Sequence, residues 1–316
     1  MKIHHSISAF SARNPVMTIG MFDGVHLGHK KLLSLVCDEA NKMNGESVVL
    51  TFWPHPQMLF NADDSFNILT TIEEKCSHLE RYGIDHCIIV PFTKEFSQIS
   101  PEQYMYDVLY KGIGAKKIII GYDHRFGHKG VGDFLLLKQF EEKYNFVVQK
   151  IPAYDIDKIT VSSTIIREAL LNGDVERAQQ YLNYHYSLQG TVVHGKKIGR
   201  TLDVPTANIV PESAYKIIPQ SGIYIVQVVY NNQIFKGVAN IGFNPTVDAE
   251  NTNRTIEVYI FEFSQEIYDE TIRLVFLKKV RDEQTFSSFT ELQDAIQKDI
   301  HIAKEYFTTH TNPITY

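Results

Sequence analysis

Residues 16–40 limit the fold of this chain more than any other stretch. The apolar run at residues 16–19 is typical of a short buried strand, and Gly20 and Gly24 then allow the backbone to turn sharply. An apolar stripe at helical spacing follows, at Leu32, Leu33, Val36 and Ala40. A strand, a tight turn and a helix start form the anion-binding unit of α/β folds, because free N–H groups and the helix dipole attract phosphate.

His26 and His29 lie three residues apart, where this helix is expected to begin. Two imidazoles there would add hydrogen-bond donors for phosphate oxygens. A pair of histidines in a surface turn can also have no function. The accompanying glycines and Asp23 favour the phosphate site over that alternative.

Apolar runs alternate with helical patterns through the rest of the first half. The expected strands lie at residues 47–52, 86–91, 117–121 and 146–151. Between them, Thr71 and Glu74 predict a capped helix that ends at Tyr82, and Ser100 predicts the start of another. Such alternation predicts a parallel, doubly wound sheet, which binds its ligands beyond the carboxyl ends of the strands.

A loop rich in proline and aromatic residues follows the second expected strand. It contains Pro54, His55 and Pro56, and Phe60 follows shortly after. The prolines stiffen the loop, and the aromatic side chains would provide a flat wall for a planar ring. A plain turn over the core is the alternative interpretation.

A glycine-rich loop at residues 121–133 is the next candidate for ligand binding. Four glycines in this loop suggest a backbone that approaches a ligand or moves. Arg125 would serve a phosphate, and Asp123 a ribose or a base edge. A flexible surface loop explains the same composition equally well.

Residues 161–167 suggest a second anion clamp. Ser163 or Thr164 is expected to cap a helix, and Arg167 lies one turn inside it. Hydroxyls and free amides at a helix start, together with a guanidinium group, bind phosphate oxygens well. The alternative is a well-capped helix that carries a surface arginine.

The sequence pattern changes near residue 183, which divides the chain into expected domains at 1–183 and 184–316. Five strand-like runs with little helix between them predict an antiparallel barrel. These runs lie at residues 188–193, 222–229, 235–241, 255–263 and 271–276. A closing helix is expected from its capping box, Ser288 and Glu291, and from an apolar stripe at Leu292, Ile296, Ile300, Ala303 and Phe307.

The second half has a polar cluster of its own. It comprises a glycine loop with Gly195, Gly199 and Arg200, two candidate oxygen ligands, Thr206 and Asn208, and the strand carboxylate of Glu257. The loop could cradle a phosphate, and hydroxyl and amide oxygens suit Mg²⁺. An ordinary proline turn and a solvent-facing strand residue are the simpler alternatives for these positions.

Taken together, these motifs resemble the bacterial bifunctional riboflavin kinase/FMN adenylyltransferase (FAD synthetase) family over nearly the whole chain. Residues 20–29 resemble its HxGH signature, and residues 205–208 its Pro-Thr-Ala-Asn motif. The resemblance implies an α/β, Rossmann-like nucleotidyltransferase domain followed by an antiparallel β-barrel riboflavin kinase domain with a C-terminal helix. ATP would be the co-substrate, riboflavin, FMN and FAD the substrates and products, and Mg²⁺ the metal.

The resemblance also assigns roles to residues. Glu257 would be the kinase base, Thr206 and Asn208 would hold Mg²⁺, and His26, His29 and Arg167 would be the catalytic residues of adenylyl transfer. It implies binding roles for Gly20, Phe22, Asp23, Gly24, Pro54, His55, Pro56, Phe60, Asp123, Arg125, Ser163, Thr164, Gly195, Gly199, Arg200 and Arg281.

Composition narrows the remaining alternatives. A formal net charge of −6 without a basic stripe argues against nucleic-acid binding, and the apolar runs are too short to span a bilayer. Three scattered cysteines, Cys37, Cys76 and Cys87, are typical of a reduced, cytoplasmic protein. Oligomeric state does not follow from the sequence.

Two rival functions remain open. One is a different HxGH adenylyltransferase with an accessory barrel. The other is a flavin-binding scaffold or sensor whose departures from the family's usual residues, Met21 and Gly130, have cost it catalysis. His124 and Asp203 depart from the usual residues as well.

Overall fold

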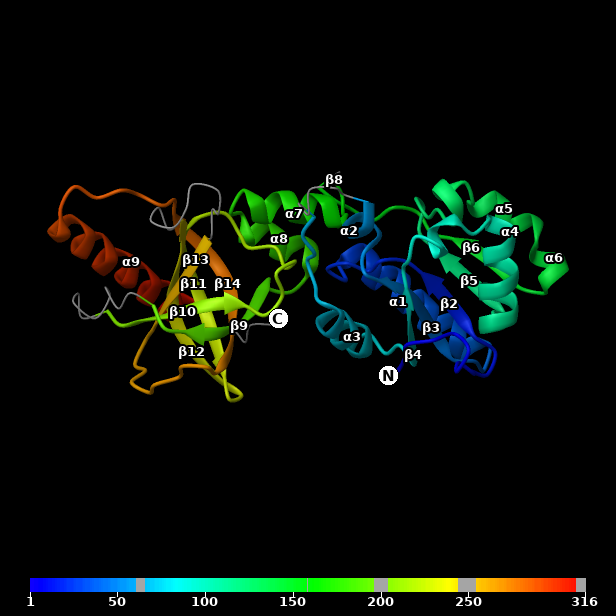
Figure 1. The fold of residues 1–316 in the computed structure, drawn as a ribbon, viewed down its shortest axis with the longest axis horizontal. Coiled ribbons are helices and arrows are strands. Elements are labelled where there is room, and N and C mark those ends of the chain that lie inside the picture. Colours follow the sequence, from blue (N-terminus) through cyan, green and yellow to red (C-terminus); the bar gives the residue numbers. More distant parts are fainter. Residues whose placement is uncertain (61–65, 158, 196–203, 244–253, 311–316) are drawn as a thin grey trace. The chain divides into compact units, whose positions relative to one another are not determined.

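The computed structural model describes residues 1–60, 66–157, 159–195, 204–243 and 254–310 (Figure 1). The chain divides into two compact units, residues 1–163 and 164–316. The expected domain boundary at residue 183 stays a prediction. No helix in the described part of the chain is long and apolar enough to cross a membrane.

The first unit contains a six-stranded sheet in which every neighbouring pair is parallel. In sheet order its strands are β1 (Lys2–His4), β4 (His86–Pro91), β3 (Ser47–Trp53), β2 (Val16–Ile19), β5 (Lys117–Ile120) and β6 (Val147–Lys150). The predicted parallel sheet is therefore confirmed, and β1 is an additional strand at its edge. A small hairpin, β7 (Asp155–Ile156) with β8 (Ile159–Thr160), follows the sheet.

Helices cover both faces of this sheet. The longer ones are α1 (Leu27–Lys42), α3 (Ile72–Arg81) and a π-helix, η2 (Tyr104–Ile113). Shorter ones are α2 (Pro56–Phe60), η1 (Phe96–Gln98), α4 (Pro101–Gln103), η3 (His128–Gly130), α5 (Phe134–Gln139) and α6 (Glu141–Tyr144). Side chains of α1 and α3 share one core with β2, β3 and β4, and those of η2 and α5 share the other. The capping box of Thr71 and Glu74 is present at α3, as predicted.

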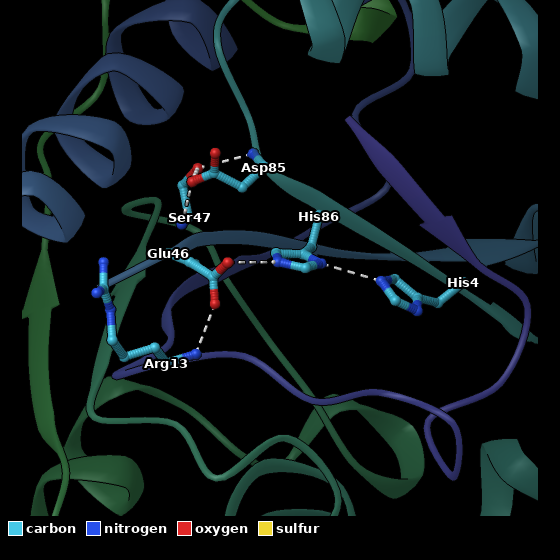
Figure 2. Close-up of polar contacts among 6 residues, drawn as sticks. All are labelled: His4, Arg13, Glu46, Ser47, Asp85 and His86. Carbon is cyan, nitrogen blue, oxygen red and sulfur yellow. Dashed lines mark hydrogen bonds and ion pairs between the residues drawn. The ribbon is translucent and has the colours of Figure 1, made fainter. Parts of the chain in front are cut away.

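A polar network joins the edge strand β1 to the start of β4 and to the segment before β3 (Figure 2). His4 Nε2 lies 3.0 Å from His86 Nδ1, and His86 Nε2 lies 3.4 Å from Glu46 Oε1. Glu46 Oε2 also accepts a hydrogen bond from the Arg13 backbone N–H at 2.6 Å. This network ties His4, the last residue of the edge strand β1, to His86, the first residue of β4.

The second unit contains a closed six-stranded barrel whose neighbouring strands are all antiparallel. Around the barrel its strands are β10 (Thr206–Pro211), β13 (Arg254–Ile260), β12 (Gln233–Phe243), β11 (Gly222–Tyr230), β14 (Thr271–Arg281) and β9 (Ser187–Val193). The predicted barrel is confirmed. The prediction missed β10, which begins inside the Pro-Thr-Ala-Asn motif.

Three helices accompany the barrel among the described residues. α9 (Phe289–Thr309) packs against the outside of the barrel through Ile300, Ala303 and Phe307, as its predicted stripe requires (Figure 1). α7 (Ser163–Leu171) and α8 (Val175–Leu182) precede the barrel, and α8 packs against β14. α7 and α8 thus fall almost entirely in the second compact unit.

Candidate active sites

A strained turn joins β2 to α1 at the carboxyl edge of the sheet. Phe22 and Val25 have φ of 49° and 35°, and Gly24 has φ of 78° between them. Residues other than glycine rarely adopt a positive φ, and β-branched residues such as valine do so least of all. Backbone outliers of this kind cluster at ligand-binding sites. The turn therefore has the shape expected of the predicted phosphate loop.

The carboxylate of Asp23 fastens this turn to the segment before α3. It accepts hydrogen bonds from the backbone N–H groups of Leu69 and Thr70, each at 3.0 Å, and from Thr70 Oγ1 at 3.2 Å. Ser163 Oγ donates to the backbone oxygen of Asp23 at 2.8 Å. The structure thus brings two predicted binding residues, Asp23 and Ser163, into direct contact.

His26 and His29 meet at the start of α1. His26 is the N-cap, and its Nδ1 accepts a hydrogen bond from the His29 backbone N–H at 3.4 Å. The two rings stack with centroids 3.7 Å apart. Burial, and then the neighbouring His26 and Lys75, hold the pKa of His29 well below 6.5. His29 is therefore neutral at pH 7 and offers a single N–H donor.

The clamp residues after Ser163 continue along α7. The sequence predicted Ser163 or Thr164 as the N-cap of this helix. The helix begins at Ser163, so its N-cap lies before both residues. Thr164 lies in the first turn and Arg167 one turn later. Both belong to the second compact unit.

An aromatic cluster gathers at the carboxyl ends of β3 and β4. Phe92 packs edge-on against Phe52, Phe60 and Phe96, with centroid distances of 5.8, 6.2 and 5.8 Å. Phe60, one of the predicted binding residues, is 61% exposed, so the aromatic cluster is open to solvent at Phe60. Pro56 begins α2, which carries Phe60, and Pro54 follows Trp53 at the end of β3. His55 Nδ1 accepts the Gln57 N–H at 3.2 Å.

Two buried polar atoms, one on η2 and one on the glycine-rich loop, lie beside this aromatic cluster. The Phe126 ring stacks on His124 and is tilted against Tyr104, with centroids 6.0 and 5.5 Å away. Tyr104 Oη and His124 Nε2 are buried and have no hydrogen-bond partner among the described residues. Both are hydrogen-bonding groups that a ligand can satisfy. By contrast, Asp123 is exposed, and Arg125 is 61% exposed and lies 3.3 Å from Asp133 Oδ2.

Burial lowers the pKa of His124 to about 4, which makes a pH prediction possible. In the unfolded chain, the same imidazole binds a proton near pH 6.5. Below pH 6.5, protonation therefore favours the unfolded chain, and the free energy of unfolding falls. We expect the free energy of unfolding of wild type to fall by about 1–2 kcal/mol more than that of His124→Phe between pH 7 and pH 5. Urea titrations at both pH values measure this difference, and parallel curves would contradict it.

The second site is a row of polar side chains across three strands of the barrel. Glu257 on β13 pairs with Asn208 on β10 and with Asn240 on β12. Residues directly opposite on neighbouring strands point to the same face, so the carboxylate lies between two amides. Thr206 Oγ1 donates to Glu257 Oε2 at 3.1 Å. The predicted base and one predicted metal ligand are therefore in contact.

A pocket of about 450 Å³ shares Thr206 with this row, and its other lining residues do not include Glu257, Asn208 or Asn240. Its lining includes Thr206 and a segment that the sequence did not suggest, residues 263–268. Tyr268 in this segment stacks on His194 with centroids 3.8 Å apart. Gly195 packs so closely on Asn208 that any side chain there would collide with the Asn208 amide.

The remaining predicted residues of this unit separate into two groups. Gly199 and Arg200 lie outside the described residues, as does Asp203. Arg281 binds Asp299 on α9 with two hydrogen bonds, Nε to Oδ1 at 3.0 Å and Nη2 to Oδ2 at 2.8 Å. In this structure Arg281 therefore joins β14 to the closing helix.

Comparison with known proteins agrees with this two-site arrangement. Residues 9–165 match the family model of FAD synthetase, and residues 182–307 match that of riboflavin kinase. A crystal structure named as a macrolide-efflux protein from Streptococcus pneumoniae is 29% identical, with a TM-score of 0.87, and the match covers 96% of this chain and 98% of that one. That name describes export, whereas both family models describe flavin nucleotide synthesis.

Curated relatives named bifunctional riboflavin kinase/FMN adenylyltransferase match over nearly their whole length. The protein from Buchnera aphidicola subsp. Schizaphis graminum is 40% identical, over 93% of this chain and 94% of its own. Those from Bacillus subtilis and Escherichia coli K12 are 35% and 34% identical, each over 96% of both chains. The chain therefore belongs to the bifunctional riboflavin kinase/FMN adenylyltransferase family.

Proposed function

We propose that this protein phosphorylates riboflavin with ATP to give FMN, and then transfers AMP from a second ATP to FMN to give FAD and pyrophosphate. The observation that carries this proposal is the presence of two unlike sites in one chain. One is a glycine turn with stacked histidines, which suits phosphate binding. The other holds a carboxylate beside a hydroxyl and two amides, which suits activation of an alcohol.

In the kinase site, Glu257 acts as the base. It takes the proton of the terminal ribityl hydroxyl while that oxygen attacks the γ-phosphorus of ATP, and ADP leaves. Its position, fixed by the Thr206 hydroxyl, supports this role. The pocket beside Thr206 has room for the rest of the nucleotide, and Gly195, Gly199, Arg200 and Arg281 are proposed to bind substrate.

The donor set near Glu257 fits Mg²⁺. The Thr206 hydroxyl donates its proton to Glu257 and keeps lone pairs on its oxygen that would be available to the ion, and the Asn208 side chain would add a carbonyl oxygen. Mg²⁺ prefers hard oxygen ligands and keeps water and phosphate oxygens for its other positions. When bound, the ion would neutralise charge on the phosphates.

In the adenylyltransferase site, the phosphate of FMN attacks the α-phosphorus of ATP and needs no base. Residues 20–24 offer backbone N–H groups for phosphate, and His26 and His29 lie at the start of α1. Ser163, Thr164 and Arg167 keep the phosphate-binding role that their sequence motif predicts. Catalysis then rests on positioning and charge stabilisation.

The flavin ring of FMN is proposed to lie on the aromatic cluster. Pro54, His55 and Pro56 shape that wall beside Phe60. Tyr104 Oη and His124 Nε2, which have no hydrogen-bond partner among the described residues, can bind polar atoms of the ring. Asp123 and Arg125, both exposed, are proposed to contact the nucleotide.

Incubation with riboflavin, ATP and Mg²⁺, followed by chromatography, tests the whole proposal. FMN followed by FAD is the expected result. Adenylylation of another phosphate acceptor in preference to FMN would favour a different adenylyltransferase. Flavin binding without ATP turnover would favour a scaffold or sensor.

We further propose that the protein works in the cytoplasm on small molecules, without nucleic-acid or membrane partners. Cys37, Cys76 and Cys87 are free thiols in the structure, which supports a reducing compartment. The net charge of −6 supports the absence of nucleic acid.

Two fragments test the domain boundary. We expect residues 164–316 and residues 184–316 both to fold and to make FMN but never FAD, because Thr206, Asn208 and Glu257 lie after both cuts. The shorter fragment should unfold at lower temperature, because it lacks α8, whose Val175, Ala178 and Leu182 are buried. Calorimetry and kinase assays measure both effects. A folded 184–316 fragment without kinase activity would show that the site needs residues before the cut.

A further inference from the structure

Asn240 on β12 is a polar side chain to which none of the steps above assigns a role. It lies directly opposite Glu257, across the edge of β13 that does not pair with Asn208. Asn240 and Glu257 are both half-buried, so a substrate can reach them. Within the described part of the chain, the Asn240 amide makes no hydrogen bond. It therefore keeps two donors and an acceptor for a ligand.

One oxygen of the Glu257 carboxylate is also free beside this amide. Thr206 Oγ1 donates to Glu257 Oε2 at 3.1 Å, whereas Oε1 has no hydrogen-bond partner among the described residues. Residues directly opposite on antiparallel strands have Cβ atoms about 5 Å apart and point to the same face. A chain with hydroxyls on neighbouring carbons can therefore contact Glu257 Oε1 and the Asn240 amide together.

The order of the strands determines on which side of Glu257 each substrate lies. The proposed Mg²⁺ ligands, Thr206 and Asn208, are on β10, which pairs with one edge of β13, and Thr206 also lines the pocket proposed for the nucleotide. β12 pairs with the other edge of β13. In phosphoryl transfer the attacking and leaving oxygens lie roughly in line, on opposite sides of the phosphorus. With ADP leaving on the β10 side, the acceptor extends from Glu257 toward Asn240.

The chemistry of the acceptor matches an amide at this position. The ribityl chain of riboflavin carries a hydroxyl on the carbon next to the one that is phosphorylated. A hydroxyl both donates and accepts a hydrogen bond, and a side-chain amide offers both kinds of partner. The amide is also neutral, so it avoids a like charge directly opposite Glu257, which would be destabilising.

We propose that Asn240 is a further substrate-binding residue of the kinase, and that its amide binds the ribityl hydroxyl next to the one that is phosphorylated. This contact holds the terminal hydroxyl at Glu257 Oε1. It also makes the kinase select a polyol chain over an alcohol that carries only the terminal hydroxyl. The inference rests on the kinase function proposed for the row that contains Glu257.

A cycle that combines an enzyme variant with a substrate analogue tests this contact. The enzymes are wild type and Asn240→Ala, and the substrates are riboflavin and an analogue that lacks the hydroxyl next to the terminal one. On riboflavin, Asn240→Ala is expected to lower kcat/KM by about 3–10-fold, the usual effect of losing one neutral hydrogen bond. On the analogue, wild type and Asn240→Ala should have the same kcat/KM, because the partner of the amide is already gone.

Three controls accompany the cycle. Gln233→Ala removes an exposed amide at the first residue of the same strand and should leave kcat/KM for both substrates unchanged. Asn240→Leu keeps the approximate size of the side chain without its amide and should behave like Asn240→Ala. Circular dichroism reports the folding of each variant.

Each outcome supports the proposal or overturns it. Equal losses on both substrates in Asn240→Ala would mean that Asn240 supports Glu257 or the barrel without binding the hydroxyl, and would overturn the proposal. Wild-type kcat/KM on riboflavin in Asn240→Ala would overturn it as well. Should Asn240→Ala fail to fold, Asn240→Leu takes its place in the cycle, and failure of both to fold would make Asn240 a structural residue. A wild type that does not phosphorylate riboflavin would instead refute the proposed kinase function, and this inference with it.

Discussion

Replacement of Glu257 by glutamine is expected to slow FMN formation by about 10²–10⁴-fold, the usual contribution of a general base. Glutamine keeps the size of the side chain and an oxygen that can accept the Thr206 hydroxyl, which now lies 3.1 Å from Oε2. Only basicity is lost, so folding of the barrel should be unaffected. Chromatographic assays with riboflavin, ATP and Mg²⁺ measure the rate.

Two controls make this result specific. FAD formation from supplied FMN should survive in Glu257→Gln, because that site lies in the other half of the chain. Glu270→Gln, an exposed carboxylate just before β14, should leave both activities unchanged. A loss of kinase activity of less than a few-fold in Glu257→Gln would make Glu257 an ordinary strand carboxylate and would remove the proposed base.

The elements that could be predicted from sequence are those with strong local patterns. The four inner strands of the sheet carry runs of buried apolar residues, and α3 and α9 carry capping serine or threonine residues and apolar stripes. β1 and β10 were missed for a physical reason. β1 is three residues long and partly exposed, and β10 starts directly after Pro205 with half-buried polar residues. Their pairing depends on partners far away in the sequence.

The site residues divide in the same way, into those that a local pattern marks and those that the fold brings together from distant positions. The glycine turn and its histidines are adjacent in sequence, so their meeting could be predicted. The Asp23 clamp on Thr70 and the Arg281 pair with Asp299 join residues 47 and 18 positions apart, and no local pattern marks them. Tyr104 was missed for a further reason, because it opens a π-helix in a region that reads as an ordinary helix.

Replacement of His29 by alanine is expected to reduce FAD formation by about 10²–10³-fold, the cost of removing one stabilising donor at a developing charge. His29 is neutral at pH 7, because burial and its neighbours hold its pKa well below 6.5. Its contribution is therefore an N–H donor rather than a full charge. His29→Asn, which retains an N–H donor, should recover part of the rate. The assay uses FMN, ATP and Mg²⁺ and follows FAD.

His29 is a cleaner target than His26. His26 caps α1 through Nδ1, so its removal would cost about 1 kcal/mol of helix stability as well as any catalytic donor. His29 Nδ1 has no partner among the described residues, so removing its ring breaks no side-chain hydrogen bond described there. His5→Ala, an exposed histidine in the same unit, is the matched control and should keep full activity. FMN formation should persist in His29→Ala, and an unchanged rate of FAD formation would show that the stacked pair does not serve the nucleotide.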